Sequence, residues 1–566
     1  LAMTRRPVNS LVIFDTAARK VIGSKTLDEI GGVAFDDQGR LFVATQKRIV
    51  RFDGLALGKI AADEKGMIDA RHQAVAVVTE GLSDPRQLLF DKGELFVADH
   101  GSAHQVKVFD ANGKLLRTIG RAGGMQLGAY QQEAMQNPAG MTIDSRGRLW
   151  VAESDYSPKR VSVWSRDGKF ERAFYGPPGY GGGGTLDPDD PTRFYLAYGS
   201  GLEFQIDWLT RTSRPVHRYW MDGSSTLKLG ADWHAAPQTP IVVGNRRYMT
   251  NAFSSSPGGF GSVVGVWRFE NGVAVPAACA GAFSDWPPLQ TDEFKSLAPD
   301  KTERRKMFFV WSDLNGDQRP QPNEVTTAVD DGIQRNNGKH VGGVYVGPDL
   351  SLTTAFGLHL KPQRFTDKGV PVYDTAQMQR LVKQLEFRWL PYDAVMSSDG
   401  WFITKAEPLR GFKNGKQLWS YPNQWPELHA CLHEPPPLPK PGQFIGTTRW
   451  LGHPVTPRGS DVGEIFALTG YYGRISLITA DGLCVGSLFQ DARSTGYFNA
   501  FEKLGPTEPG QLLNSASLQT ECFFDTITQH HDGRIYLQAG KSQCNIVRLD
   551  GLESIRRIPD QDFDLQ

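Results

Sequence analysis

The sequence has no long apolar run, few cysteines and no excess of either charge. No stretch approaches the roughly 18 apolar residues that a membrane-spanning helix requires, so no membrane span is predicted. Lysine and arginine number 62, as do aspartate and glutamate, and this zero net charge favours neither nucleic acid nor an anionic membrane as a partner. The five cysteines show no CxxC or CxxCH spacing, which argues against a zinc ribbon or a c-type haem.

The sequence gives only indirect evidence of the cellular compartment of the protein. The opening residues, LAMTRRPVNS, lack the hydrophobic core of a signal peptide, which fits either a trimmed exported chain or a cytoplasmic one. Cys522 and Cys544 flank one hairpin and could form a disulfide, the alternative being two buried thiols. A calcium-binding loop, described below, favours an exported protein.

Long helical patterns are nearly absent, whereas glycine (61) and proline (35) are abundant. This composition is typical of many short strands joined by turns. Residues 138–176 read as four strands, PAGMTID, RLWVAE, VSVWS and FERAFYG, with turns at Gly147 and at Asp167-Gly168. One such sheet cannot bury both of its faces, so it needs copies of itself to pack against.

Copies of this unit are present elsewhere in the chain. They occupy residues 31–54, 85–120 and 524–551. The turn glycines Gly39, Gly93 and Gly147 follow one another at a constant interval of 54 residues. Because this register is kept over three units, the sequence predicts an all-β fold of the β-propeller class.

The repeats resemble the NHL-repeat family of β-propellers. The resemblance is carried by Pro138 to Met141 at the start of one unit, and by Phe96 to Asp99 and Trp150 to Glu153 in the second strands. It is clear over residues 31–176 and 520–560 and weak between them. It implies a ring of four-stranded blades.

The whole chain, residues 1–566, is interpreted as a single propeller of seven to nine blades, with eight expected; two smaller propellers are the alternative. Long connections between blades are expected to gather on one face and to build the binding site. The expected parts are outer strands at 8–30 that close the ring with 520–560, regular blades at 31–176, irregular blades at 177–300, and blades with long inserts at 300–519.

The most specific chemical signal is a loop at residues 313–324 that resembles an EF-hand calcium loop. The residues that could donate oxygen ligands occupy the ligand positions of an EF-hand loop. Ca²⁺ prefers six to eight hard oxygen ligands. Gln318 replaces the usual glycine at the sixth position, and a solvated acidic turn is the alternative. The predicted ligands are Asp313, Asn315, Asp317, the carbonyl of Arg319, Gln321 and Glu324.

Histidines at the ends of expected inner strands are candidates for a second metal. His340 and His530 could converge with another side chain on a transition-metal ion such as Zn²⁺, as in the NHL-type peptidyl-hydroxyglycine lyases, which this chain resembles in architecture only. Arg86 is expected at a blade mouth, as are Asp99 and Glu153. We take His340, His530 and Arg86 as candidate catalytic residues, with hydrogen-bonded channel residues as the alternative.

Two functions follow from these observations. The first is an exported, extracellular or periplasmic, monomeric scaffold that binds a glycan or a protein and carries a structural Ca²⁺. The second is a metal-dependent lyase or hydrolase that acts on an extracellular polysaccharide or peptide at the channel mouth. Aromatic residues of the inserts favour stacking on sugar rings: Trp286, Trp419, Tyr421, Trp425, Tyr471 and Tyr472.

Overall fold

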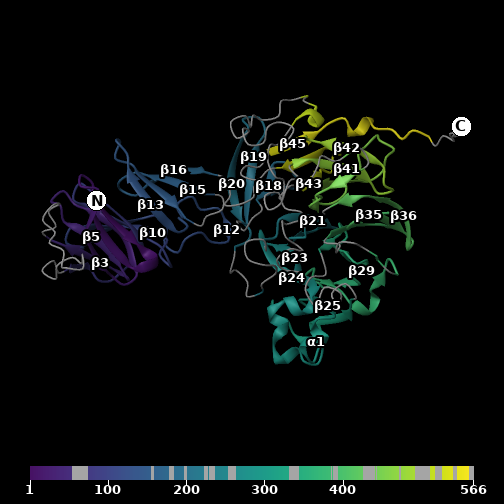
Figure 1. Ribbon diagram of the computed structural model, residues 1–566, viewed down its shortest axis with the longest axis horizontal. Coiled ribbons are helices and arrows are strands. Elements are labelled where there is room, and N and C mark those ends of the chain that lie inside the picture. Colours follow the sequence, from purple (N-terminus) through teal and green to yellow (C-terminus); the bar gives the residue numbers. More distant parts are fainter. Residues whose placement is uncertain are drawn as a thin grey trace. The chain divides into compact units, whose positions relative to one another are not determined.

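A computed structural model of the chain describes residues 1–53, 74–154, 159–176, 184–196, 201–221, 227, 236–252, 263–330, 343–383, 385–386, 393–424, 440, 443–470, 473–490, 510, 512–516, 526–539 and 545–559. Regular structure in these residues is almost entirely antiparallel β-strand (Figure 1). The α-helix found among them is α1 (Lys301–Arg304), which is accompanied by short 3-10 turns. The predicted all-β class is therefore confirmed.

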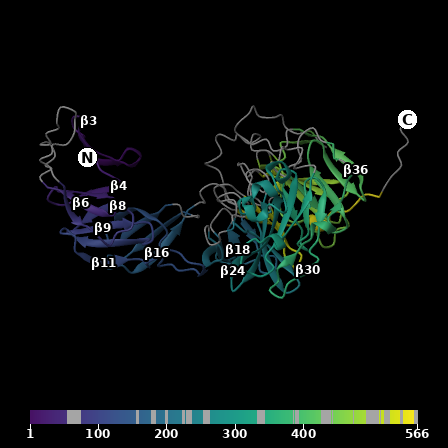
Figure 2. The ribbon, with the colours of Figure 1, turned by 90° about the horizontal axis from the view of Figure 1, so that it is seen from below.

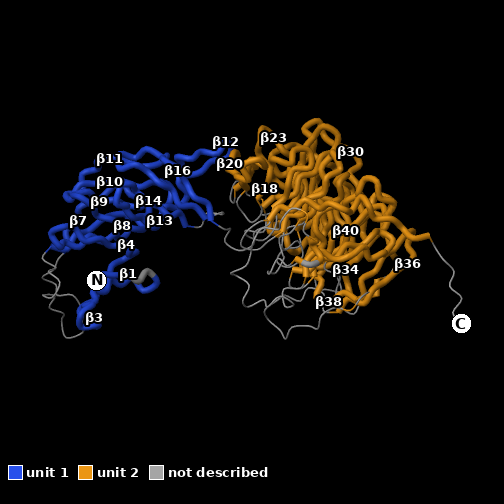
Figure 3. The backbone as a smooth tube through the Cα atoms, turned by 90° about the horizontal axis from the view of Figure 1, so that it is seen from above, with its two compact units in different colours: residues 1–179 blue, residues 180–566 orange. Residues whose placement is uncertain are grey.

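The chain divides into two compact units, residues 1–179 and residues 180–566 (Figure 3). The sequence left open one ring or two smaller ones, and each unit is described here by itself. The number of blades stays a prediction.

Unit 1 contains four consecutive antiparallel sheets, which follow the chain from purple to blue in Figure 2. Their strand orders are β1-β2-β3, β4-β5-β6-β7, β8-β9-β10-β11 and β13-β14-β15-β16, and the first strand of each sheet contacts the first strand of the next. The described strands are β1 (Ala2–Arg5), β2 (Ser10–Asp15), β3 (Lys20–Thr26), β4 (Ile30–Phe35), β5 (Leu41–Thr45), β6 (Arg48–Phe52), β7 (Ala74–Val78), β8 (Pro85–Asp91), β9 (Glu94–Asp99), β10 (Gln105–Asp110), β11 (Leu115–Ile119), β12 (Gly128–Ala129), β13 (Pro138–Ile143), β14 (Leu149–Glu153), β15 (Arg160–Trp164) and β16 (Phe170–Tyr175).

The repeated turns form as the sequence predicts. Gly147 has a φ of +77°, and its counterparts Gly39 and Gly93 have φ values of +74° and +80°, which glycine adopts without steric penalty. In the same turn, Asp144 Oδ1 accepts hydrogen bonds from two backbone amides at 2.9 and 3.0 Å. This side chain closes the turn and sets the register of the two strands that it joins.

Acidic residues at the ends of second strands anchor the following repeat. Asp99 accepts hydrogen bonds from the backbone amides of Ser83 and Asp84 at 2.9 and 2.8 Å, just before β8 begins. Glu153 accepts one from Gln136 at 2.8 Å, just before β13. Both carboxylates are buried and paired with a cation, so they are structural residues.

The N-terminal strands form a sheet of their own. β1 pairs with β2 in the register Ala2↔Ile13, and β2 pairs with β3, so residues 10–26 are the second and third strands of that sheet. The described strands of the C-terminal segment instead form the separate sheet β43-β44-β45. The expected sheet shared by 8–30 and 520–560 is therefore not found among the described strands, because Ala2–Arg5 supplies the missing neighbour.

Unit 2 contains further antiparallel sheets in chain order. The main ones are β20-β19-β18-β17, β21-β22-β23-β24-β25-β26, β27-β28-β29-β32, β33-β34-β35-β36, β39-β40-β41-β42 and β43-β44-β45. The described strands are β17 (Gly184–Leu186), β18 (Arg193–Leu196), β19 (Leu202–Asp207), β20 (Thr212–Arg218), β21 (Thr239–Val243), β22 (Arg246–Thr250), β23 (Val263–Glu270), β24 (Val273–Ala282), β25 (Met307–Ser312), β26 (Val325–Val329), β27 (Val344–Val346), β28 (Leu352–Thr354), β29 (Leu358–Leu360), β30 (Arg364–Phe365), β31 (Pro371–Val372), β32 (Gln379–Arg380), β33 (Asp393–Met396), β34 (Trp401–Lys405), β35 (Leu409–Lys413), β36 (Lys416–Tyr421), β37 (Asn423–Gln424), β38 (Phe444–Ile445), β39 (Arg449–Trp450), β40 (Ile465–Thr469), β41 (Ile475–Thr479), β42 (Cys484–Leu488), β43 (Thr526–Gln529), β44 (Ile535–Ala539) and β45 (Asn545–Leu549).

The first and last of these sheets are joined by side chains. Thr526 Oγ1 donates to the carbonyl of Gly184 at 2.5 Å, and the backbone amide of Leu186 donates to Gln538 Oε1 at 3.4 Å. β17 thus contacts both β43 and β21. Unit 2 closes on itself through buried polar contacts, which is the arrangement of a propeller.

Part of the connection between β24 and β25, residues 283–306, belongs to the core. Trp286 is fully buried and stacks on Phe309 at 5.1 Å between ring centroids. It lies beside Trp311, at 5.7 Å. The expectation that Trp286 is exposed for sugar stacking was therefore wrong, because the short turns around it fold back onto β25.

Candidate functional site

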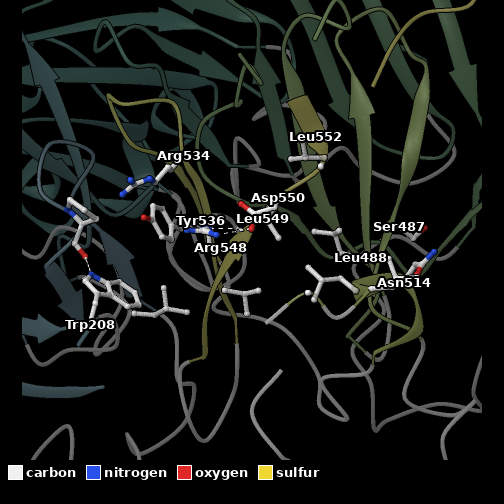
Figure 4. Close-up of a pocket in the computed structure, with 17 residues that line it drawn as sticks. Trp208, Ser487, Leu488, Asn514, Arg534, Tyr536, Arg548, Leu549, Asp550 and Leu552 are labelled. Carbon is white, nitrogen blue, oxygen red and sulfur yellow. Dashed lines mark hydrogen bonds and ion pairs between the residues drawn. The ribbon is translucent and has the colours of Figure 1, made fainter. Parts of the chain in front are cut away.

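An open groove of about 950 Å³ lies in unit 2 over strand β45 (Figure 4). Its floor is formed by Ile546 to Leu549. Figure 4 shows Trp208, Tyr536 and Arg534 on one side of the groove and Leu488 on the other. These side chains come from three different sheets, so the groove is a product of how the sheets are arranged.

One wall of the groove is aromatic and basic. Trp208 is 44% exposed and stacks on Tyr536 with 6.1 Å between ring centroids. Its indole Nε1 donates to the carbonyl of Pro191 at 3.0 Å, which fixes the ring at the groove. Arg548 pairs with Asp550 at 2.9 Å, and both are exposed. This wall therefore combines a fixed aromatic face with hydrogen-bonding groups.

The opposite wall combines aliphatic side chains with the polar side chains of Ser487 and Asn514. It contains Leu488 at the end of β42 and Leu513 in the following turn. Both pack against a buried cluster that includes Leu549 of the floor and Ile535 of β44. A ligand in the groove would meet an aliphatic surface on this side and the Trp208 ring on the other.

The calcium-like loop lies between β25 and β26 and is fully described. Asp313 is buried, and its Oδ1 accepts the backbone amides of Gly316 and Gln318 at 3.1 and 3.2 Å. Its Oδ2 is also buried and has no hydrogen-bond partner among the described residues. Gln318, at the position that EF-hand loops give to glycine, has a φ of +57°. The chain therefore makes the required left-handed turn without glycine.

Glu324 closes the loop from its other end. Its Oε1 accepts the backbone amides of Leu314 and Asn315 at 2.9 and 3.3 Å, and its Oε2 accepts Trp311 Nε1 at 3.1 Å. Burial raises the pKa of Glu324 and also that of Asp313. Two buried carboxylates with raised pKa values, and with no ion-pair partner among the described residues, form an environment that a cation would stabilise.

The remaining predicted ligands lie on the exposed side of the loop. Asn315 Nδ2 donates to Asp317 Oδ2 at 3.1 Å and to Gln321 Oε1 at 3.3 Å, and the Arg319 backbone amide donates to Asp317 Oδ1 at 2.7 Å. Across the part of the chain that the structure describes, no three His, Cys, Asp or Glu side chains are placed to hold a metal ion. The oxygen-rich donor set nevertheless has the chemistry that Ca²⁺ prefers.

Two of the three candidate catalytic residues lie in the described residues, one in each unit. His340 lies outside the described residues. His530 is buried in the turn after β43, where its Nδ1 is 3.1 Å from Asp532 Oδ1. Arg86 belongs to unit 1 and donates to Asp84 Oδ2 at 2.6 Å. His530 and Arg86 each have a local acidic partner, and their catalytic role stays a prediction.

The described aromatic residues of the other inserts, Trp419 and Tyr421, contribute little free surface. Trp419 and Tyr421 are half-buried, and each donates to a backbone carbonyl of the next sheet, at 3.1 and 2.6 Å. Trp425, Tyr471 and Tyr472 lie outside the described residues, as do Cys522 and Cys544. Among the described residues, Trp208, which follows a strand and stands in a tight turn, offers an exposed aromatic ring.

The sequence did not lead to the prediction of one pair of oppositely charged residues in unit 2. Asp393 and Lys405 face each other across β33 and β34, and burial lowers the pKa of Lys405 to about 7. Asp393 Oδ2 accepts the Trp450 backbone amide at 3.0 Å, and Lys405 Nζ donates to the Thr448 carbonyl at 2.5 Å. The pair ties two neighbouring sheets together. Its sequence signal is a single charge at the end of each of two apolar strands.

Comparisons with known proteins give little further guidance. No protein-family model and no curated protein match the chain. Among solved structures, BamB from Moraxella catarrhalis is 12% identical, with a TM-score of 0.21, over 72% of this chain and 88% of that one. A protein of unknown function from Bacteroides caccae is 12% identical, with a TM-score of 0.22, over 49% of this chain and 92% of that one. Similarities of this extent carry no argument, and the fold class rests on the strands themselves.

No helix in the described residues combines the length and apolar character needed to span a bilayer.

Proposed function

We propose that this chain is a binding module that holds a protein partner in the groove over β45. The observation that carries the proposal is the fixed, 44% exposed Trp208 ring opposite an aliphatic wall, in a groove of about 950 Å³. Tryptophan and tyrosine supply large contact areas at little entropic cost, and they are enriched at protein interfaces. An exported monomer, extracellular or periplasmic, is the setting that we propose.

Trp208→Ala is expected to weaken binding about thirtyfold, because central aromatic anchors contribute about 2 kcal/mol or more to an interface. The partner would first be found by screening the full chain against a displayed library of random peptides and against a glycan array. Affinities would then be measured by calorimetry.

Leu209→Ala is the matched control, since Leu209 is 93% exposed and is not a lining residue of the groove. It should leave the affinity unchanged. Equal affinities for Trp208→Ala and wild type would refute the groove as the binding site. If a glycan binds and its binding depends on Trp208, the groove remains the binding site but its ligand is a glycan.

We further propose that the loop at 313–324 binds one structural Ca²⁺. The buried, unpartnered Asp313 Oδ2 and the left-handed turn at Gln318 support this proposal. The ion would be held by Asp313, Asn315, Asp317, the Arg319 carbonyl, Gln321 and Glu324. Bound to oxygen ligands alone, Ca²⁺ would supply charge neutralisation and cross-link the loop.

Millimolar CaCl₂ is expected to raise the melting temperature of the chelator-treated protein. At a hundredfold excess over Kd the stabilisation is about 2.7 kcal/mol. Asp313→Asn should abolish this increase, whereas Asp374→Asn, a helix cap elsewhere in unit 2, should retain it. No increase, or an equal increase with MgCl₂, would count against the site.

The alternative function is that of a metal-dependent lyase or hydrolase. It requires a transition metal held by histidines that include His340 and His530. Elemental mass spectrometry of the purified protein decides between the two functions. A transition metal such as Zn²⁺ near one per chain would favour the enzyme, and calcium alone would favour the binding module.

A further inference from the structure

Among the described strands, the sheet β43-β44-β45 has fewer strands than its neighbours. The sheets on either side of it continue to a fourth strand, β20 in one and β42 in the other. Within the described residues, no strand pairs with the far edge of β45. An edge strand presents unpaired backbone N–H and C=O groups at every second residue, and such an edge is a template for another strand.

This edge, which no described strand covers, is the floor of the groove. Ile546 to Leu549 line it, so a ligand that fills the groove lies along the backbone of β45. The two walls match the alternation of side chains in a strand. Arg548 pairs with Tyr536 in the sheet, on the face of the Trp208 ring, whereas Leu549 pairs with Ile535 in the aliphatic cluster.

We propose that the groove accepts an extended polypeptide segment of a partner protein, which adds to β45 as the fourth strand of the sheet. This inference rests on the proposed function and specifies its ligand. The neighbouring sheets give the geometry, because β19–β20 and β41–β42 are both antiparallel pairs. The outer strands β42, β36 and β20 have 5, 6 and 7 residues, so a segment of similar length fills the position.

The side-chain pattern of the segment follows from the walls. Every second residue would face Leu488 and Leu513, and these residues should be aliphatic. The intervening residues would face Trp208 and Tyr536, which favour flat or aliphatic contacts. Main-chain hydrogen bonds to β45 would provide much of the affinity, and the two walls would provide selectivity.

Other occupants fit the groove less well. A glycan has no backbone with the two-residue repeat of donors and acceptors that the edge presents. A second copy of this chain cannot pair its own β45 here, because that strand lies at the bottom of the same groove between two walls. An exposed, extended segment of another protein can reach the floor.

The test uses nine-residue random peptides displayed against the full-length chain. The best binder is synthesised, together with versions that carry a single backbone N-methyl group at each position in turn. We expect N-methylation to reduce affinity at least tenfold at alternate positions and to be tolerated at the positions between them. Hydrogen exchange should slow in peptides that cover Asn545–Leu549 when the binder is present.

The two levels of the proposal fail in different ways. If binding depends on Trp208 but N-methylation has no alternating effect and β45 gains no protection, strand addition is overturned while the groove remains a binding site. If binding is also indifferent to Trp208→Ala, the proposed function fails as well. If no peptide is enriched and a glycan binds through Trp208, the polypeptide ligand is overturned. Leu209→Ala should behave as wild type throughout.

Discussion

Arg160→Ala is expected to destabilise unit 1 by about 3 to 5 kcal/mol, because it leaves a carboxylate buried without its cation. Arg160 and Glu153 form an ion pair at 2.8 Å, and neither side chain is exposed. Arg160 also donates to the backbone carbonyls of Ala134 and Gln132, which precede β13. One substitution therefore removes the pair and two anchors of the first strand of the sheet.

The loss should depend on pH in a definite direction. Burial raises the pKa of Glu153 to about 7 against the lowering effect of Arg160, and removal of Arg160 raises this pKa further. A carboxyl group whose pKa is raised on folding loses stability as pH rises through that value. The loss of folding stability caused by Arg160→Ala should accordingly be larger above pH 7 than below it.

Native-state hydrogen exchange of peptides from residues 138–175 measures this effect within unit 1. Arg172→Ala is the control, since Arg172 lies exposed on β16 of the same sheet and should change stability by no more than about 0.5 kcal/mol. A loss below 1 kcal/mol for Arg160→Ala, at every pH, would contradict the anchoring role of the pair.

His453→Gln is expected to remove a large acid-induced loss of stability in unit 2. His453 lies after β39 and is half-buried, and its Nε2 donates to the carbonyl of Val346 in β27 at 2.9 Å. Burial lowers its pKa from 6.5 to about 4. Its contribution is therefore fully present above pH 6.5 and is lost as pH falls towards 4. The loss amounts to about 3 kcal/mol, at roughly 1.4 kcal/mol per pKa unit.

Glutamine keeps a donor for Val346 but does not titrate, so the variant should show a flatter stability curve between pH 6.5 and pH 4. Urea denaturation at a series of pH values measures the curve. His531→Gln is the control, because His531 is exposed and its substitution should leave the slope unchanged. If the curves of stability against pH are parallel for wild type and His453→Gln, protonation of this histidine does not affect the stability of unit 2.

The regular blades could be predicted because their signals are local. The alternation of apolar residues and the glycine of each turn, such as Gly147, depend on neighbours within a few positions. The strand β1 was missed because four residues, Ala2–Arg5, are too few to show a period. A strand of that length is recognised only by its pairing with β2, and this pairing is visible only in the folded structure.

The candidate site was harder to predict than the fold. The loop at 313–324 keeps its ligands close in sequence, so their spacing was visible. The groove depends on Trp208, Leu488 and Tyr536, which come from three sheets and meet only after folding. Trp286 misled the prediction for the same reason, since whether a long insert turns inward or outward depends on the volume left in the core.

The junction of β17 with β43 has a consequence for how the protein is made. Gly184 and Thr526 are separated by 342 positions in the chain. At about 5 to 20 residues per second, a ribosome needs about 20 to 70 s to travel that distance. Throughout this time the first sheet of unit 2 lacks its final neighbour on the side of β43, and that side is open to wrong partners. Contacts this distant also slow refolding. A chaperone that shields the first sheet during synthesis would therefore affect the yield of native protein more than one that acts on the last sheet.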